Sequence, residues 1–194
     1  AYADERAFAV VAIDRDNYGI FEGKVRMPYV PGLLSFREGP LILSAFKKIS
    51  PKPDLLLIDG HGIAHPRRFG LACWVGIKLK IPTIGVAKSL LTGKIVSDKI
   101  VIENEVRGAV LKTKFKPIYV SPGHLITLQE SVEIVKSLLH NHRLPEPLYL
   151  AHLYSTQAKK RYVADKAGRA LKKHRSAEES YPEHKKRLDI HLSY

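Results

Sequence analysis

The feature that most constrains this chain is a buried strand that ends on an acid. The run PDLLLIDG (53–60) contains the apolar stretch LLLI (55–58), which is followed directly by Asp59. The apolar stretch FGLACWVGIKL (69–79) then predicts a helix, and PTIGVA (82–87) predicts the next strand. A strand, a helix and a strand in this order form a right-handed crossover between parallel strands. Sites in such sheets form at the carboxyl ends of the strands, so we expect one beside Asp59.

Further strands are predicted on both sides of this unit. The run AFAVVAI (7–13) is apolar on both faces and predicts a buried strand. The alternating run IFEGKVRM (20–27) predicts a strand that returns antiparallel to it. The segments VRGAVLKT (106–113) and PIYVSPG (117–123) predict a hairpin. Together with the parallel unit, these strands predict one α/β domain with a mixed central sheet.

Three further segments have apolar residues at helical spacing: 33–49, 127–140 and 148–171. Pro40 lies within the first of them and marks either its first helical turn or a break between two short helices. Thr127 is the predicted N-cap of the second, since a glutamate follows three residues later. The third is strongly basic and predicts a helical extension at the C-terminal side of the domain.

The residues after the buried strand combine an acid with glycines and histidines. Asp59 is a candidate metal ligand, and a helix N-cap is the alternative. Gly60 and Gly62 permit close approach of a ligand to the backbone. His61 and His65 are candidate ligands, general bases or phosphate donors, with a structural role as the alternative.

Charged residues elsewhere complete a set suited to phosphate chemistry. Arg67 and Arg68 open a predicted helix, where cations are disfavoured by the helix dipole, and this favours contact with an anion such as phosphate. Glu38, in SFREGP, could join Asp59 on Mg²⁺, and two such ions can clamp the oxygens of a phosphodiester. The remaining candidates are His152 as a ligand or base and Lys88 as a partner of phosphate.

Composition favours a polyanionic partner. The 194 residues carry a formal net charge of +13, and 159–187 holds eleven Lys and Arg against four acids. That excess indicates nucleic acid, with a solvated basic face as the alternative. The single cysteine, Cys73, reads as a small core residue and fits a reducing cytosol, so we expect a cytoplasmic protein. No apolar run has the length of a membrane span.

Five motifs occur in order and carry a family resemblance. They are PYVPGLLSFREGP (28–40), DGHGIAHPRRFGLA (59–72), PTIGVAKS (82–89), VSPGH (120–124) and RLPEP (143–147) followed by LAH. From about Ala7 to Tyr154 the chain resembles endonuclease V. The resemblance implies a ribonuclease-H-like mixed central sheet flanked by helices. It also implies Mg²⁺-dependent hydrolysis of the second phosphodiester 3′ to inosine (deaminated adenine) in DNA repair, with Mn²⁺ as the alternative ion.

The same resemblance implies roles for individual residues. It makes Glu38 and Asp59 metal carboxylates and places His152 near the metals. It makes Tyr29, beside Pro31, the wedge that enters the base stack. The nucleic-acid-binding set that we expect is Tyr29, Pro31, Gly60, Gly62, His65, Arg67 and Lys88. His61 departs from the family, whose members usually carry a small amide side chain at this position.

One element of the family pattern is displaced. The family begins with a strand whose aspartate is the first metal ligand, and LDIHLSY (188–194) resembles that strand at the opposite end of this chain. This predicts a circular permutation, with a chance similarity in a tail as the alternative. The family's aspartate falls on His191, while Asp189 shares its face of the strand and is the predicted third carboxylate. The predicted division is a catalytic core in 1–154, a basic helical extension in 155–187 and the permuted strand in 188–194.

Two functions are compatible with this pattern. The first is a nuclease that acts on DNA containing deoxyinosine, with inosine-containing RNA as the alternative substrate. The second is a protein that binds inosine-containing nucleic acid with weak or no cleavage, because the first aspartate is displaced. A metal-dependent nicking assay separates the two.

Overall fold

The computed structural model describes residues 1–25, 27, 28, 30 and 32–179, with side chains up to residue 170. The chain divides into two compact units, Ala1–Lys159 and a second that begins at Lys160. No helix in these described ranges is long and apolar enough to cross a membrane.

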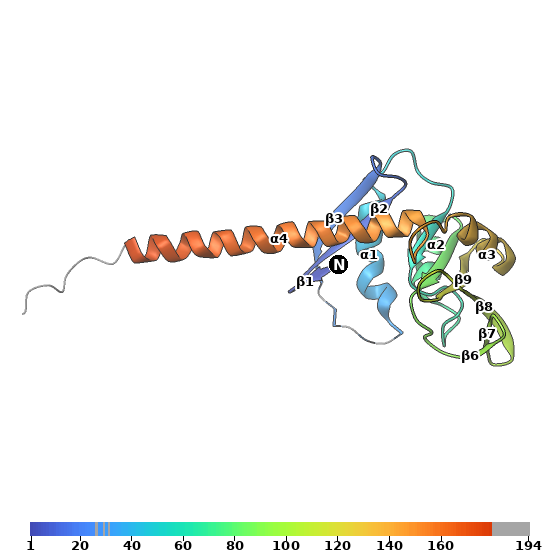
Figure 1. Ribbon diagram of the computed structural model, residues 1–194. Coiled ribbons are helices and arrows are strands. Elements are labelled where there is room, and N and C mark those ends of the chain that lie inside the picture. The colour runs from blue at the N-terminus through green and yellow to red at the C-terminus, as the bar shows by residue number, and fades with distance from the viewer. Residues whose placement is uncertain (26, 29, 31, 180–194) are drawn as a thin grey trace, which may run out of the picture. The chain divides into compact units, whose positions relative to one another are not determined.

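The strands of the first unit form two sheets (Figure 1). The smaller sheet is antiparallel, in the order β1-β2-β3, and contains β1 (Tyr2–Ala3), β2 (Arg6–Ala12) and β3 (Tyr18–Lys24). The larger sheet has the order β4-β5-β9-β8-β7-β6 and contains β4 (Leu56–Asp59), β5 (Thr83–Ala87), β6 (Lys94–Val96), β7 (Lys99–Ile102), β8 (Glu105–Leu111) and β9 (Ile118–His124). Only β4 and β5 pair in parallel, so this sheet is mixed as predicted.

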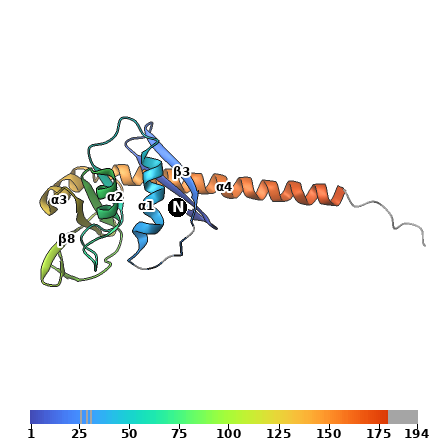
Figure 2. The same ribbon diagram turned by 180° about the vertical axis from the view of Figure 1, so that it is seen from behind.

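Three helices and the start of a fourth pack on these sheets. They are α1 (Leu34–Phe46), α2 (Leu71–Leu79), α3 (Leu128–Ser137) and α4 (Glu146–Glu179). Figures 1 and 2 both show α1 beside α2, and α1 also packs on β2 and β3. In the larger sheet, α2 contacts β5 and β9, while α3 contacts β8 and β9. The predicted α/β class with a mixed sheet flanked by helices is therefore confirmed, but the strands predicted at 7–13 and 20–27 form a separate antiparallel sheet instead of joining the mixed one.

Local sequence signals set the ends of these helices. The predicted N-cap of α3 is confirmed, since the Thr127 hydroxyl accepts from the Glu130 amide while the Glu130 carboxylate accepts from the Thr127 amide. Both roles predicted for Pro40, a first helical turn or a break, are wrong, because α1 begins at Leu34 and runs continuously through Pro40. Proline lacks the amide that would bond to the carbonyl of Phe36, four residues earlier. The Phe36 side chain is exposed, so this turn of the helix faces water, which can satisfy the carbonyl.

The two larger of three apolar clusters join most elements of the first unit. One joins β2, α1, β4 and α2 through buried residues that include Val11, Ala45, Ile58 and Val75. The other joins β5, β8, β9, α3 and the start of α4. Ile58 is only 4% exposed to solvent, and the next residue is the exposed Asp59. The strand therefore ends on an acid at the point where the core ends.

The edges of β2 and β4 frame two cavities. Within the described residues, β4 is the last strand of its sheet, and β1 covers the second edge of β2 only at Arg6 and Ala7. Cavities of about 170 and 160 Å³ lie along these edges and share the lining residues Val10, Leu57, Leu148 and Ala151. The strand predicted for 188–194, beside 7–13, lies outside the described residues and stays a prediction.

The close packing of β3 on α1 predicts the effect of a single methyl group. A Cβ atom on Gly19 would lie 2.4 Å from the Ala45 carbonyl oxygen, which is backbone and cannot rotate away. We expect Gly19→Ala to destabilise the fold by about 1–3 kcal/mol in chemical denaturation, as overpacking does.

Gly168→Ala is the matched control, because nothing lies within 4 Å of a Cβ atom at that helical position. It should raise helix content in circular dichroism, since alanine favours helix over glycine. A Gly19→Ala protein as stable as the parent would contradict the packing described for β3 and α1.

Candidate metal and nucleic-acid site

The parallel pair β4 and β5 brings Asp59 and Lys88 together. Asp59 is in register with Val86, so both strands end at the same edge and Lys88 follows directly after β5. The Lys88 Nζ atom lies 2.6 Å from Asp59 Oδ2. Both side chains remain more than one third exposed, so this ion pair adds little stability. The ion pair does bring a carboxylate and an ammonium group together at the edge of the sheet where β4 and β5 end.

Glu38, on α1, lines a cavity beside Asp59. It lines the 170 Å³ cavity together with Asp59, His152 and Tyr2, whose hydroxyl donates a hydrogen bond to Glu38 Oε1. Burial raises the pKa of Glu38, and the negative charge of Asp59 adds to this, while the Tyr2 hydrogen bond partly offsets it. Burial and the Glu38 carboxylate also raise the pKa of Tyr2. The cavity thus gathers two carboxylates at a cost that a cation would relieve.

His152 enters this cavity from the second turn of α4. Its backbone carbonyl accepts hydrogen bonds from the hydroxyls of Ser155 and Thr156, each at 2.9 Å. The side chain is exposed. The structure therefore brings together Glu38, Asp59 and His152, from three separate elements, as expected of a common site.

A second cavity, of about 270 Å³, opens on the other side of Asp59. Its polar lining includes Asp59, Gly60, His61, His65 and Lys88. Its apolar lining includes Leu34, Phe69, Leu71 and Leu91. Asp59 borders both cavities, so an occupant of the second cavity lies next to one of the two carboxylates of the first.

The two predicted glycines have different surroundings. Gly60 lines the second cavity. Gly62 is buried, and a Cβ atom there would lie 1.9 Å from the Pro122 carbonyl oxygen. The Gly62 amide donates to Ser121 Oγ at 2.9 Å, in the buried interior. Packing against β9 therefore explains why Gly62 carries no side chain, and its contact with nucleic acid stays a prediction.

The two histidines of this loop are held neutral. Burial lowers the pKa of His61 to about 4, and the nearby His65 contributes. Burial also lowers the pKa of His65, helped by the charge of Arg67. Neutral imidazoles offer hydrogen bonds rather than positive charge at neutral pH. One ring nitrogen of His61, Nδ1, is buried and has no hydrogen-bond partner in the described part of the chain.

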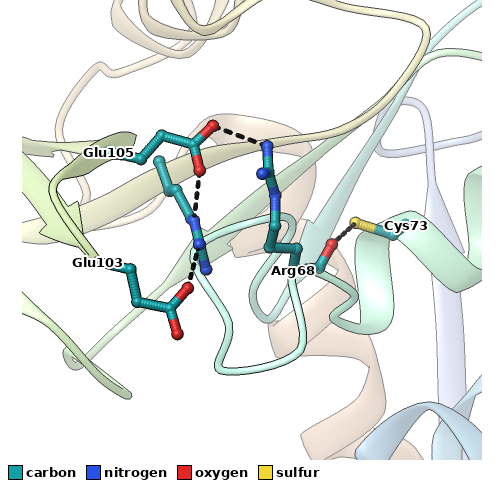
Figure 3. A network of polar contacts seen from close by, with 5 residues as sticks. Arg68, Cys73, Glu103 and Glu105 are labelled. Atoms are coloured by element: carbon teal, nitrogen blue, oxygen red, sulfur yellow. Dashed lines mark hydrogen bonds and ion pairs between the residues drawn. The ribbon is translucent and has the colours of Figure 1, made fainter.

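The two arginines that follow are held by other parts of the fold. Arg67 donates to the carbonyl of Gly32 at 3.2 Å, which connects Gly32 to this loop. Arg68 pairs with Glu105 at 2.7 Å (Figure 3), and Glu105 also binds the buried Arg107. The guanidinium of Arg68 is thus tied to β8, while its contact with phosphate, like that of Arg67, stays a prediction.

Three predicted site residues lie outside the described residues. They are Tyr29, Pro31 and Asp189. Sequence reasoning in turn missed Tyr2 as a partner of Glu38 and Arg143 as a contact of the backbone at Lys88. No local pattern identifies these two, because each acts on a residue more than thirty positions away.

Two hard oxygen donors of this site fit a divalent cation. Glu38 and Asp59 present carboxylates to one cavity, and carboxylates are the side chains that Mg²⁺ prefers. Within the described ranges, no three His, Cys, Asp or Glu side chains form a metal-ligand group. The residues present therefore supply part of a ligand set.

Comparison with known proteins gives a consistent result. The family model of endonuclease V matches residues 5–153. Endonuclease V of Dictyoglomus thermophilum is 46% identical over 170 residues, which cover 80% of this chain and 75% of that protein. Endonuclease V of Thermosipho melanesiensis is 45% identical over 149 residues, or 72% of this chain and 66% of that protein. The chain thus spans about two thirds to three quarters of the length of these relatives.

Solved structures of the same name have the same fold. Endonuclease V from Bacillus subtilis superposes with a TM-score of 0.71 at 31% identity, covering 82% of each chain. Endonuclease V (D234N) of Ciona intestinalis, in complex with a 23mer DNA containing an inosine followed by a ribo-adenosine, gives a TM-score of 0.66 at 27% identity. That match covers 81% of this chain and 85% of the other. These similarities identify a member of a nuclease family. The family is endonuclease V, and this chain belongs to it.

Proposed function

We propose that this protein is a divalent-metal-dependent endonuclease that recognises inosine in DNA and hydrolyses the second phosphodiester 3′ to it, in DNA repair. The observation that carries the proposal is the convergence of Glu38, Asp59 and His152 on one cavity, with Lys88 against Asp59. Membership of the endonuclease V family and the inosine-containing DNA bound by the Ciona relative support it. The single, buried cysteine is compatible with action in the cytoplasm.

Glu38 and Asp59 are the proposed metal ligands, with Mg²⁺ as the ion and Mn²⁺ as the alternative. Asp189, outside the described residues, is the proposed third carboxylate, within the permuted strand proposed for 188–194. The bound ion would stabilise negative charge on the phosphodiester oxygens. The Lys88 ammonium contacts the Asp59 carboxylate, and it could also face phosphate. His152, which lines the same cavity, is the proposed group that exchanges a proton, at a ring nitrogen.

The second cavity is the proposed site for the flipped base. Its apolar side chains can pack on the faces of a purine, and Gly60 leaves room for a base edge to approach the backbone. Neutral imidazoles at His61 and His65 can exchange hydrogen bonds with that edge. Tyr29, with Pro31, is the proposed wedge that unstacks the base, at a cost that is least for a mispaired base. The same contacts would accept inosine in RNA, which is the alternative substrate.

A second function has one observation in its favour. Within the described residues, the carboxylates of the cavity number two, and no group of three metal-binding side chains forms. A protein with this partial set would bind inosine-containing nucleic acid and cut it weakly or not at all. The assay that follows separates the two functions.

We predict that Asp59→Asn abolishes metal-dependent nicking of a duplex with a single inosine and leaves the fold intact. Asparagine keeps the size of the side chain but removes the charge that would bind the cation. Nicking is measured on labelled DNA with and without Mg²⁺ or Mn²⁺, and folding is measured by thermal melting.

Asp54→Asn is the control, since Asp54 is an exposed acid outside both cavities. It should nick at the parental rate. Parental nicking by Asp59→Asn would refute the metal assignment, and the absence of inosine-dependent nicking in the parent protein would favour the binding function.

The basic extension proposed for 155–187 would add affinity that does not depend on sequence. Within 160–170, all side chains except Tyr162 are exposed, and the basic ones outnumber the single acid, Asp165. Lys and Arg that contact phosphate release bound counterions, which makes affinity depend on salt. Replacing Lys159, Lys160 and Arg161 by Gln should therefore reduce the slope of log affinity against log salt by up to about 0.9 per lost contact on duplex DNA.

The control for this prediction neutralises three exposed lysines of the first unit, Lys47, Lys80 and Lys99. It should keep the parental slope in the same fluorescence-anisotropy titrations. If the Lys159, Lys160 and Arg161 variant kept the parental slope of log affinity against log salt, these side chains would not contact phosphate and would form only a solvated basic face.

A further inference from the structure

Arg143 connects three backbone carbonyls around the end of β5. It lies in the loop between α3 and α4, and its Nε donates to the carbonyl of Lys116 at 3.2 Å. One terminal nitrogen donates to the carbonyl of Pro117 at 2.8 Å and also to the carbonyl of Lys88. A guanidinium suits this task because it is planar and directs several N–H donors in fixed directions.

The bond to Lys88 fixes the backbone beyond the point where the sheet does. The last pair between β5 and β9 joins Ala87 to Tyr119, so Lys88 is the first residue past the ladder. Its flexible side chain reaches Asp59 through an ion pair that is partly exposed to water. Such a pair does not by itself hold two long side chains in one geometry. The carbonyl of Lys88, held by Arg143, supplies a second fixed point.

We propose that Arg143 is a positioning residue for the reaction: it holds the backbone of Lys88 so that the ammonium group meets Asp59 beside the metal carboxylates. Asp59 would then keep one orientation toward the cation, and Lys88 one orientation toward phosphate. The inference rests on the proposed function for its catalytic consequence. Its structural part stands on the described contacts alone.

If Arg143 had a purely structural role, its replacement would have a different effect on cleavage. The bonds to Lys116 and Pro117 could serve only to attach the loop before α4 to the start of β9. Loss of that attachment would lower stability, and the effect on cleavage would then be independent of Lys88. Coupling between Arg143 and Lys88 therefore separates the two roles.

The first experiment is a double-mutant cycle on kcat for nicking of an inosine-containing duplex, in the full chain, with melting followed in parallel. Arg143→Gln should lower kcat by roughly ten- to a hundredfold, the scale of a small misplacement. In the Lys88→Ala background, the same change should cause no further loss. Equal losses in both backgrounds would overturn the proposal. Arg6→Gln, which removes the exposed pair with Glu22, is the control and should not change kcat in either background.

The second experiment does not depend on nicking, so it separates failure of this inference from failure of the proposed function. An amine-reactive ester labels lysines, and mass spectrometry reports the rate at each site. Arg143→Gln should raise labelling of Lys88 several-fold and leave labelling of the exposed Lys47 unchanged. Arg143→Lys keeps the charge without the forked donors and should behave like Arg143→Gln. Unchanged labelling of Lys88 in both variants would overturn the proposal even if the parent protein nicks DNA.

Discussion

The parallel pairing of β4 with β5 is the constraint on which the rest of the site depends. Because the two strands run in the same direction, their carboxyl ends open at one edge, and Asp59 and Lys88 meet there. The other groups are added to this edge by elements that pack against it. Glu38 comes from α1 and His152 from α4, and both line the same cavity as Asp59. A shift of β4 against β5 would separate Asp59 from Lys88.

Asp59 lines two cavities, and in the proposed function this position connects base recognition with cleavage. On one side lie Glu38 and His152, and on the other lie Gly60, His61 and apolar side chains. A base held in the second cavity would bring its own phosphodiester backbone toward the carboxylates. Burial lowers the pKa of His61 and His65, so the histidines of the second cavity are neutral. The chain as a whole carries a formal net charge of +13. In the proposed function, the positive charge would attract nucleic acid, and uncharged groups inside the cavity would distinguish the base.

Elements with a local pattern could be predicted from the sequence, and contacts between distant side chains could not. The strand that ends on Asp59, the parallel pair and the capping box at Thr127 all have signals within a few residues, and the structure contains them. The hairpin of β6 and β7 was not predicted, since its strands are only three and four residues long. At the site, Tyr2 on Glu38, Glu105 on Arg68 and Arg143 on Lys88 have no periodic signal. Each depends on which strands become neighbours, and tertiary packing decides that.

The most direct test of whether Glu38 and Asp59 share one cation is a titration of the full chain with Mn²⁺. The electron paramagnetic resonance signal of the free ion measures how much Mn²⁺ is bound. The account predicts saturable binding that weakens by at least about tenfold in either Glu38→Gln or Asp59→Asn, since even indirect support of a metal ligand contributes that much. Glu22→Gln, a change at an exposed acid on β3, should bind like the parent. Equal Mn²⁺ affinity in the parent, Glu38→Gln and Asp59→Asn proteins would contradict the account.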